Sequence, residues 1–393
     1  MMSIKLFPAE YGDCIMLSTG KESQYNILID GGLSKTYQKY IKSEIQHIKE
    51  KRQKIGLLVC THMDNDHICG LIQVLKETNP DFIDNVWYNG FFQIVNSRFY
   101  SQKENCFTDR DNKILDEIIS QGVVSDSEQE IGINEGMSLG VLIEESKIPL
   151  NLVVEGRAIC SELVKNRYEI ATNIFITVLG PSKNNIIELE DHWKKDMVSR
   201  NYMFRVSDKI KLTKAFEYQM ERIKSICSNE SFKICENEDL TKYIGDLSER
   251  DESIVNRSSI SFILEYNEKK YLFLGDTVID RTILKNIENV VGFEYRFSAI
   301  KLPHHGSRYN ITHDFISRYS ADEYYCLTNS IKYGHPDLEV LSTILCKDSK
   351  FKKLIFNYLI GKAYFLNKEE WKEKYNYEVI IGDGKTIVER IFE

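Results

Sequence analysis

Residues 55–70 read IGLLVCTHMDNDHICG, and this stretch decides both the fold and the site of the chain. Its first part, Ile55–Cys60, is a continuous apolar run, which predicts a short strand buried on both faces. Four potential metal ligands follow within six residues, namely His62, Asp64, Asp66 and His67. Side chains at alternate positions of an extended strand end point to one side. The first three can therefore converge and the fourth joins them at the start of the next helix, a donor set suited to zinc, manganese or iron.

The same residue types recur downstream, each time directly after a predicted strand. Asp276 follows the strand YLFL, the pair His304-His305 follows AIKL, and His335 comes after the strand at Tyr324–Thr328. Each of these alone could be an ordinary polar residue that caps a strand or faces solvent. Together they predict that several His and Asp side chains meet at one sheet edge and complete a metal site.

Outside residues 61–67, which we call the metal loop, short apolar runs alternate with charged segments of helical spacing. Further runs of strand character are Ser3–Leu6, Cys14–Ser18, Tyr25–Ile29, Val86–Tyr88, Ile174–Leu179, Ser259–Tyr266, Tyr271–Leu274 and Ser298–Leu302. Lys35–Lys54 carries apolar residues at helical spacing, and Leu71–Lys76 starts a second helix. Tyr377–Ile381 and Thr386–Ile391 flank Gly382-Asp383-Gly384, which is typical of a hairpin. This alternation predicts an α/β or mixed sandwich.

Two stretches break the alternation. The pattern weakens over about residues 91–140, and residues 182–253 are long, polar and helical in character. The second stretch is polarised, since basic residues dominate His192–Lys224 and acidic residues dominate Ser228–Glu252. It is interpreted either as a solvated helical insertion or as a surface for a substrate or partner. We expect one domain over residues 1–393, with both stretches as insertions into its core.

Composition narrows the class of protein. No apolar run reaches 18 residues and the N-terminus has no apolar core after a basic tip, so we expect no membrane span, no signal peptide and a cytoplasmic location. The nine cysteines include no CxxC pair, which favours reduced, buried thiols. The formal net charge of −8 argues against a nucleic-acid groove over the whole surface but allows a local basic patch.

The motif THMDNDH at residues 61–67 resembles the HxHxDH signature of the metallo-β-lactamase superfamily, with Asp64 in place of the middle histidine. With its glycine three residues past the last histidine, it is similar to the hydrolase domain of the DNA-uptake channel protein ComEC. Further motifs of the resemblance are GDC at Gly12–Cys14, IDGG at Ile29–Gly32, SSISFILEY…YLFLGD at Ser258–Asp276, KLPHHGS at Lys301–Ser307 and YGHP at Tyr333–Pro336. The resemblance covers about residues 1–90, 174–181 and 254–340. It implies the αββα sandwich of the metallo-β-lactamase fold, with the two insertions.

A narrower resemblance rests on two other runs. GMSLGVLIEESKIPLNLVVEGRAI at residues 136–159 and FITVLGPSKNNIIELEDHWKKD at residues 175–196 look like stand-alone enzymes of this fold from bacterial antiviral defence loci. Some of those enzymes are found beside STAND-type ATPases. This resemblance implies a role in defence and a protein partner from the same system.

The superfamily resemblance also implies a role for each ligand. The implied metal ligands are His62, Asp64, Asp66, His67, Asp276 and either His304 or His335. The first two would hold one ion, the next two a second ion, and the aspartate of the GD motif would bridge them. His305 is a weaker candidate for the same task or a residue that supports the ligands. Asp30 of IDGG would support the ligand loop through hydrogen bonds.

The sequence departs from the superfamily pattern in two ways. No convincing histidine stands for the third motif, because His192 lies in a charged helical stretch and reads as a surface residue. The carboxylate of Asp64 makes the first site richer in oxygen, which favours manganese more than an all-histidine site would. The expected cofactor is therefore one or two divalent ions, Zn²⁺ or Mn²⁺.

A metal-bound hydroxide at such a site predicts hydrolysis, with Asp66 as both ligand and proton acceptor. The first hypothesis is a phosphodiesterase or nuclease acting on nucleic acid or a nucleotide, with phosphate contacts from Lys301, Arg308 and Lys332. Those three cations could equally be ordinary surface charge. The second hypothesis is a hydrolase of a carbonyl substrate, such as a lactone, lactam, thioester or peptide. The third is a regulatory module that turns over only when a partner activates it.

Overall fold

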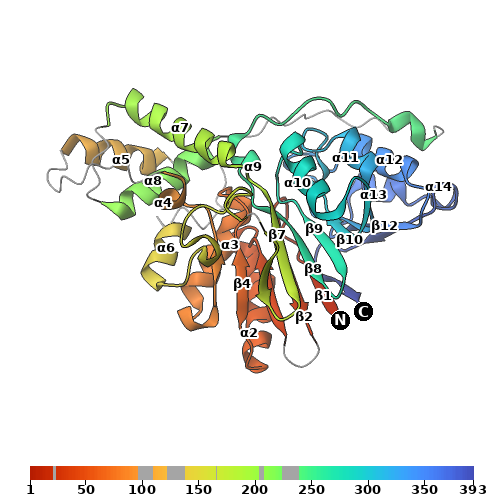
Figure 1. The fold of residues 1–393 in the computed structure, drawn as a ribbon, viewed down its shortest axis with the longest axis horizontal. Helices are drawn as coiled ribbons and strands as arrows, with labels where there is room; N and C mark the ends of the chain where they lie inside the picture. The colour runs from red at the N-terminus through yellow and green to blue at the C-terminus, as the bar shows by residue number, and fades with distance from the viewer. Residues whose placement is uncertain (21–23, 96–108, 122–137, 165, 203–207, 224–238) are drawn as a thin grey trace.

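The computed structural model of the chain describes residues 1–20, 24–95, 109–121, 138–164, 166–202, 208–223 and 239–393. Its strands form two sheets that lie face to face, with helices on both outer sides (Figure 1). Parts of both expected insertions, and Cys106, Cys227 and Cys235, lie outside the described residues. The six cysteines within the described ranges form no disulfide.

The first sheet has six strands in the order β14-β1-β2-β3-β4-β5. Its strands are β1 (Met2–Leu6), β2 (Ile15–Thr19), β3 (Tyr25–Ile29), β4 (Ile55–Val59), β5 (Val86–Trp87) and β14 (Val388–Phe392). The second sheet has eight strands in the order β13-β12-β11-β10-β9-β8-β7-β6. Its strands are β6 (Tyr168–Ala171), β7 (Ile174–Gly180), β8 (Ser261–Tyr266), β9 (Lys269–Phe273), β10 (Tyr295–Lys301), β11 (Tyr319–Cys326), β12 (Lys352–Phe356) and β13 (Tyr377–Ile381).

Helices cover the outer face of each sheet. Those before β8 are α1 (Ser34–Thr36), η1 (Tyr37–Ile41), α2 (Lys42–Glu50), α3 (Asn65–Glu77), η2 (Pro80–Phe82), α4 (Phe91–Ile94), α5 (Asp109–Gln121), α6 (Leu139–Ser146), η5 (Leu152–Val154), α7 (Lys183–Ser199), α8 (Lys209–Glu221), η6 (Leu240–Tyr243) and α9 (Ile254–Arg257). Those after it are α10 (Arg281–Val291), η7 (Pro303–Gly306), α11 (His313–Arg318), α12 (Leu338–Lys347), α13 (Gly361–Leu366) and α14 (Glu369–Tyr375). None of the helices in the described ranges has the length and apolar character needed to cross a bilayer.

The buried apolar residues form three layers, which explains the continuous apolar run at β4. Leu57 and Val59 of β4 pack into the cluster between the sheets, where they meet residues such as Phe262 of β8. Leu58 and Cys60 face the other way, into the cluster between the first sheet and its helices. A third cluster lies between the second sheet and helices α10–α14. The predicted αββα sandwich is therefore confirmed.

The predicted hairpin around Gly382-Asp383-Gly384 is wrong. β13 pairs in parallel with β12 in the eight-stranded sheet, whereas β14 pairs antiparallel with β1 in the six-stranded sheet. The glycine-rich turn therefore crosses from one layer to the other, and Gly382 N donates to the carbonyl of Phe356 (2.7 Å). The physical reason is that each strand covers the open edge of a different sheet, which pairs backbone groups that would otherwise be exposed.

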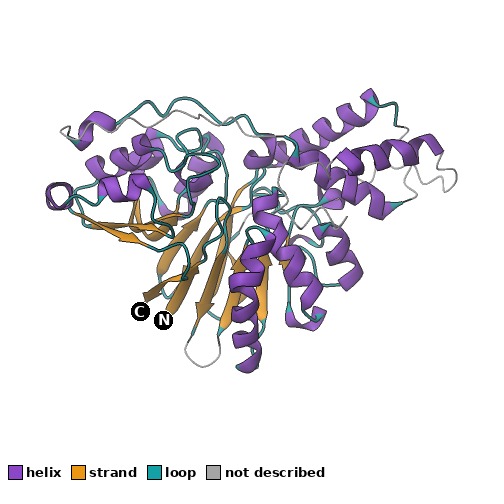
Figure 2. Cartoon of the chain, turned by 180° about the vertical axis from the view of Figure 1, so that it is seen from behind, coloured by secondary structure: helices purple, strands orange, loops and turns teal. Residues whose placement is uncertain are grey.

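The described helices of the two expected insertions share a core with the first sheet. Trp193 of α7 and Phe216 of α8 are fully buried and belong to the same apolar cluster as Leu71 of α3. Their rings lie edge to face, with centroids 5.3 Å apart. Figure 2 shows these helices extending away from the sheets on the side of α3. These helices pack against the rest of the molecule and are not only a solvent-exposed surface.

The IDGG turn after β3 lies directly on helix α3. Gly31 N donates to the carbonyl of His67 (2.8 Å), and Gly70 N donates to the carbonyl of Gly32 (2.9 Å). A Cβ atom on Gly70 would lie only 1.9 Å from the carbonyl oxygen of Gly31. Glycine is therefore required where turn and helix meet, because both neighbours are backbone and cannot move aside.

We expect Gly70→Ala to lower the free energy of unfolding by at least about 2 kcal/mol, since a methyl group would force the IDGG turn off helix α3. Urea unfolding followed by circular dichroism measures the change. Gly361→Ala is the matched control, because its Cβ would meet nothing within 4 Å at the first residue of α13. Equal stability of the two variants would contradict this account of the turn.

Candidate metal centre

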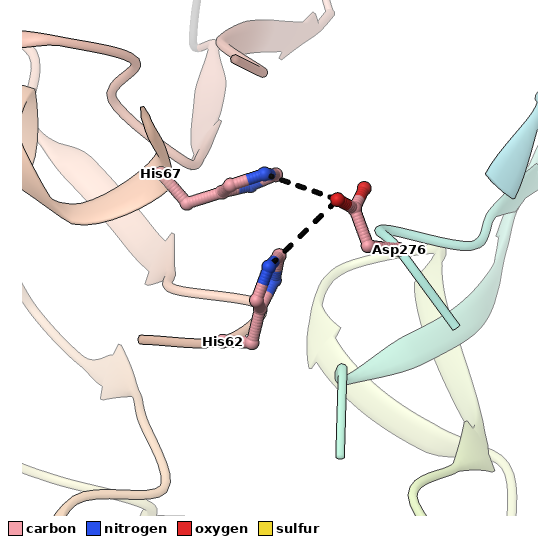
Figure 3. Close-up of side chains that lie close together, drawn as sticks. All are labelled: His62, His67 and Asp276. Carbon is pink, nitrogen blue, oxygen red and sulfur yellow. Dashed lines mark ion pairs between the residues drawn. The ribbon is translucent and has the colours of Figure 1, made fainter. Parts of the chain in front are cut away.

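Side chains from both sheets meet where their strands end. His62 lies three residues after β4, and Asp276 lies three residues after β9. The Nε2 atoms of His62 and His67 lie 3.8 and 3.5 Å from Oδ2 of Asp276, and Figure 3 shows both imidazoles directed at that carboxylate. These three residues place one donor atom each within 4.8 Å of one another, and all three are buried. The convergence predicted for this sheet edge is thus present in the structure.

The orientation of His67 is fixed by Asp30. Asp30 lies at the end of β3 with a left-handed backbone (φ 54°), and its carboxylate accepts hydrogen bonds from the backbone N–H of Thr61 (2.7 Å) and from the Thr61 hydroxyl (2.7 Å). Nδ1 of His67 lies 2.9 Å from Oδ2 of Asp30. With Nδ1 engaged in this way, Nε2 is the nitrogen directed into the site, which is the usual arrangement for a metal-binding histidine.

Asp64 and Asp66 lie on either side of the start of α3. Asp64 is the N-cap residue, yet its side chain makes no capping hydrogen bond. Its Oδ2 instead lies 3.5 Å from Nε2 of His62. Asp66, in the first turn, forms a second compact group with His67 and His305. Burial raises the pKa of the Asp66 carboxyl, and the charges of His67 and Lys332 partly offset that rise.

A strained turn after β10 separates the two adjacent histidines. His304 and His305 both have left-handed backbones (φ 44° and 56°), and Gly306 follows at φ 92°. Such residues persist only where the surroundings fix them, and here His304 N donates to the carbonyl of Gly275 (3.0 Å). As a result the two imidazoles face different carboxylates. Nε2 of His304 lies 3.8 Å from Oδ2 of Asp276, and Nδ1 of His305 lies 3.3 Å from Oδ1 of Asp13.

His335 lies on the same side of the site as His304. Their ring centroids are 4.9 Å apart, and Nδ1 of His335 lies 3.4 Å from Oδ2 of Asp337. Burial lowers the pKa of His335 to about 4, so its ring is neutral over the ordinary pH range, as a metal ligand must be. The structure therefore brings His304, His305 and His335 all to the site, including the one that sequence analysis ranked lowest.

The donor atoms at this site suit a divalent metal ion. Several buried nitrogen and oxygen atoms have no hydrogen-bond partner among the described residues: Nε2 of His62, Nε2 of His67, both ring nitrogens of His305 and His335, and Oδ1 of Asp276. Buried polar atoms are nearly always paired, so this many in one place indicates a bound group. Imidazole nitrogens with carboxylate oxygens form the donor set of Zn²⁺ and Mn²⁺ sites.

The charge at the site supports the same interpretation. The carboxylates in or touching the cluster are Asp13, Asp30, Asp64, Asp66, Asp251, Asp276 and Asp337, and the buried ammonium among them is Lys301. When all are ionised, negative charge exceeds positive charge, and divalent cations would offset the excess. Burial alone would raise the pKa of Asp276, but the imidazoles of His304 and His67 hold it well below its usual range.

Lys301 lies beneath the site. Its side chain is only 1% exposed, forms an ion pair with Asp13, and donates to the carbonyl of Gly275 (2.9 Å). Its Nζ also lies 3.6 Å from Oδ1 of Asp276. Burial would raise the pKa of Asp13, but Lys301 and His305 lower it to about 2. Because this ammonium faces carboxylates of the protein itself, we assign no substrate contact to Lys301.

The other two predicted substrate contacts differ in their accessibility. Arg308 is half-buried and donates to the hydroxyl of Tyr309 (2.8 Å) and to Glu339 (3.5 Å). Lys332 is exposed, and its Nζ lies 4.3 Å from the ring centroid of Tyr11 and 5.0 Å from that of Tyr333. The ring centroid of Tyr333 is in turn 5.9 Å from that of His304. Lys332 is thus the cation at the mouth of the site.

Three residues at the site were missed by sequence reasoning. Asn310 and Asp251 hold His304, whose Nδ1 lies 3.1 Å from Oδ1 of Asn310 and 3.7 Å from Oδ2 of Asp251. Asp251 is buried at the end of the second insertion, and no local pattern marks it. The third residue, Asp13, lies in the GDC motif, which was a usable signal. The buried site contains five of the eight histidines, whereas His192 lies half-buried on α7 and outside every metal-type group in the described ranges.

Comparison with known families identifies the segment that carries the metal loop. The family model described as the metallo-beta-lactamase superfamily matches residues 10–82. This segment contains the GDC motif, IDGG, THMDNDH and all of helix α3. A search among curated protein sequences found no match.

Solved structures similar to this chain include three proteins. They are the metallo-beta-lactamase fold protein YhfI from Bacillus subtilis (8% identity, TM-score 0.38, covering 99% of both chains), Zn²⁺-bound PqqB from Methylobacterium extorquens (8%, 0.40, 100% of both) and Igni18, a metallo hydrolase from the archaeon Ignicoccus hospitalis (11%, 0.38, 100% of both). The two-sheet topology and the family match over the metal loop agree with the metallo-β-lactamase fold predicted from the sequence.

We expect the purified protein to bind one or two equivalents of Zn²⁺ or Mn²⁺, and His67→Ala to weaken binding by more than about 100-fold. Removing even a residue that merely supports a ligand costs roughly 10–100-fold, and His67 belongs to all three metal-type groups of the described chain. Titration calorimetry with elemental analysis measures both quantities. His47→Ala is the control, because His47 is exposed on α2. Wild-type affinity in the His67 variant would exclude this centre.

The buried pair of Asp13 and Lys301 gives a second prediction. In metal-free protein, Asp13→Asn should lower the free energy of unfolding by about 3–5 kcal/mol, because it leaves the buried ammonium without its partner. The double variant Asp13→Asn/Lys301→Met should regain most of that loss, since it removes both charges. Urea unfolding of the four proteins completes the double-mutant cycle. Additive losses would show that the two side chains do not depend on each other.

Proposed function

We propose that this chain, which has the metallo-β-lactamase fold, is a metal-dependent hydrolase that cleaves phosphodiesters. The observation that carries the proposal is the meeting of unpartnered ring nitrogens of His62 and His67 with the carboxylate of Asp276. The histidines come from the loop of one sheet and the aspartate from the other sheet. This arrangement suits a catalytic metal ion better than a structural one. The cluster lies at the ends of strands, and the exposed ammonium of Lys332 lies at its mouth.

The donor groups form two compact sets that share His67. One is His62, His67 and Asp276, with Asp64 beside His62, and the other is Asp66, His67 and His305. The histidines after β10 and β11 complete the surroundings, with His304 next to Asp276 and His305 next to Asp66. Bound divalent cations would supply a water of lowered pKa and neutralise the charge that develops on the scissile group.

Asp66 is the residue that we assign to proton transfer. Its carboxylate is buried beside His67 and His305, and burial raises its pKa, which makes it a better proton acceptor. Gly12 holds it in place, since a Cβ on Gly12 would lie 1.9 Å from the carbonyl oxygen of Asp66.

Two features support a phosphodiester as the substrate. The exposed ammonium of Lys332 lies at the mouth of the site, where its charge also acts on Asp66. A lysine is a common point-charge partner for a phosphate oxygen. The sequence motifs also resemble the hydrolase domain of the DNA-uptake channel protein ComEC. The metal centre itself would serve a carbonyl substrate equally well. The contact of Lys332 with a phosphate oxygen is therefore what distinguishes a phosphodiester from a carbonyl substrate.

One contact favours a partner-activated form of the same enzyme. Glu221 at the end of α8 accepts a hydrogen bond from Asn65, which lies inside the metal loop. A partner that moved α8 would therefore act directly on that loop. The proposed setting in antiviral defence is supported only by the resemblance of two sequence runs. A phage challenge of cells with and without the gene tests it.

We expect hydrolysis of bis-p-nitrophenyl phosphate with Mn²⁺ or Zn²⁺, lost on adding EDTA, and no cleavage of a neutral lactone or of nitrocefin. Asp66→Ala should lower kcat by about 100- to 10,000-fold, because it removes the proton acceptor. His192→Ala should keep full activity, since His192 lies outside the site. Metal binding without diester cleavage would refute the phosphodiester substrate, and cleavage of the lactone would assign the carbonyl class instead.

A further inference from the structure

A cleft of about 280 Å³ lies beside the metal centre and is not part of it. The residues that characterise its wall are Glu10, Lys35, Lys39, Tyr40, Ile331 and Tyr358. They come from the loop after β1, from the helical segment after IDGG, and from the loops after β11 and β12. None of these six residues belongs to the metal-type groups of the described chain.

The cleft and the mouth of the metal centre share two loops. Glu10 lines the cleft, and the next residue, Tyr11, lies under Lys332 at the mouth. Ile331 likewise lines the cleft and immediately precedes Lys332. Hydrogen bonds join the loops, because the N–H of Asn329 donates to the carbonyl of Glu10 (2.6 Å). Consecutive Cα atoms are only about 3.8 Å apart, so the cleft lies next to the loops that carry Tyr11 and Lys332.

The wall of the cleft combines aromatic, apolar and cationic side chains. Tyr40 and Tyr358 provide rings, while Ile331 (82% exposed) and Leu359 (68% exposed) provide an apolar rim that is otherwise unprotected from water. Lys35 is neutralised by Glu10 at 2.6 Å. Lys39 is exposed and forms no ion pair with any carboxylate in the described ranges, which leaves a local positive charge in a chain of net charge −8.

We infer that this cleft is a subsite for one nucleotide unit adjoining the scissile phosphodiester. The base or sugar ring packs against the tyrosines and the apolar rim, and a further phosphate lies at Lys39. Aromatic rings with nearby cations are the usual means of binding single nucleotides without reading their sequence. The volume of about 280 Å³ lies just below the roughly 300–1,000 Å³ of small-molecule sites, which suits one unit. The inference rests on the proposed phosphodiester substrate and names its class, a nucleotide chain.

The test compares thymidine 3′,5′-bisphosphate with thymidine 5′-monophosphate by titration calorimetry on the Mn²⁺-loaded protein. The bisphosphate carries a phosphate for the mouth and another for Lys39, so we expect it to bind at least about fivefold more tightly than the monophosphate. Lys39→Glu should abolish that preference. Lys51→Glu is the matched control, because it makes the same charge change on an exposed lysine at the far end of the same helical segment and should keep the preference.

Two results would overturn the inference. One is equal affinity of wild-type protein for the two nucleotides, and the other is equal loss of preference in the Lys39 and Lys51 variants, which would show a general charge effect. Turnover of bis-p-nitrophenyl phosphate by wild-type protein tests the proposed function separately, because this diester has no second phosphate. Failure of wild-type protein to cleave this diester would reject the proposed function, whereas a lost nucleotide preference alone would reject only the subsite.

Discussion

The carboxylate of Asp30 is the interaction on which the rest of the site depends. It accepts two hydrogen bonds from Thr61 and engages Nδ1 of His67, so it holds both ends of the metal loop at once. Gly31, which follows it, lets the turn lie directly on helix α3, where a side chain would collide with backbone. A single buried acid thus fixes where the loop sits and which nitrogen of His67 is directed toward Asp276.

The site forms only because two sheets are packed face to face. The loop after β4 brings histidines and aspartates from one layer, and Asp276 and the HHGS turn come from the other. This concentration of carboxylates would be unfavourable in a buried cluster without compensating cations. One compensating charge, Lys301, belongs to the chain, and divalent ions would offset the remaining negative charge. The packing of the two sheets thereby creates a negatively charged site between them, which a bound metal ion would stabilise.

The helices of the two expected insertions are part of this arrangement and do not lie apart from it. Helix α8 contacts the metal loop through Glu221 and Asn65, and the end of the second insertion delivers Asp251 to His304. Both halves of the site are therefore touched by residues that lie outside the two sheets. Through these contacts, a movement of either segment would shift the metal loop or His304.

The sequence by itself determined the elements whose information is local. The buried strand, the cluster from His62 to His67 and the strand ends that carry Asp276, the HHGS turn and His335 could all be read from periodicity and spacing, because a ligand directly after a strand lies at that strand's end. Tertiary structure alone decided three matters. It sent β13 and β14 to different sheets, since edge pairing is a long-range choice. It directed His304 and His305 toward different carboxylates through a left-handed turn. It also placed Asp251 next to His304 and Asp13 next to Lys301, because such pairs depend on which distant segments the two packed layers bring into contact.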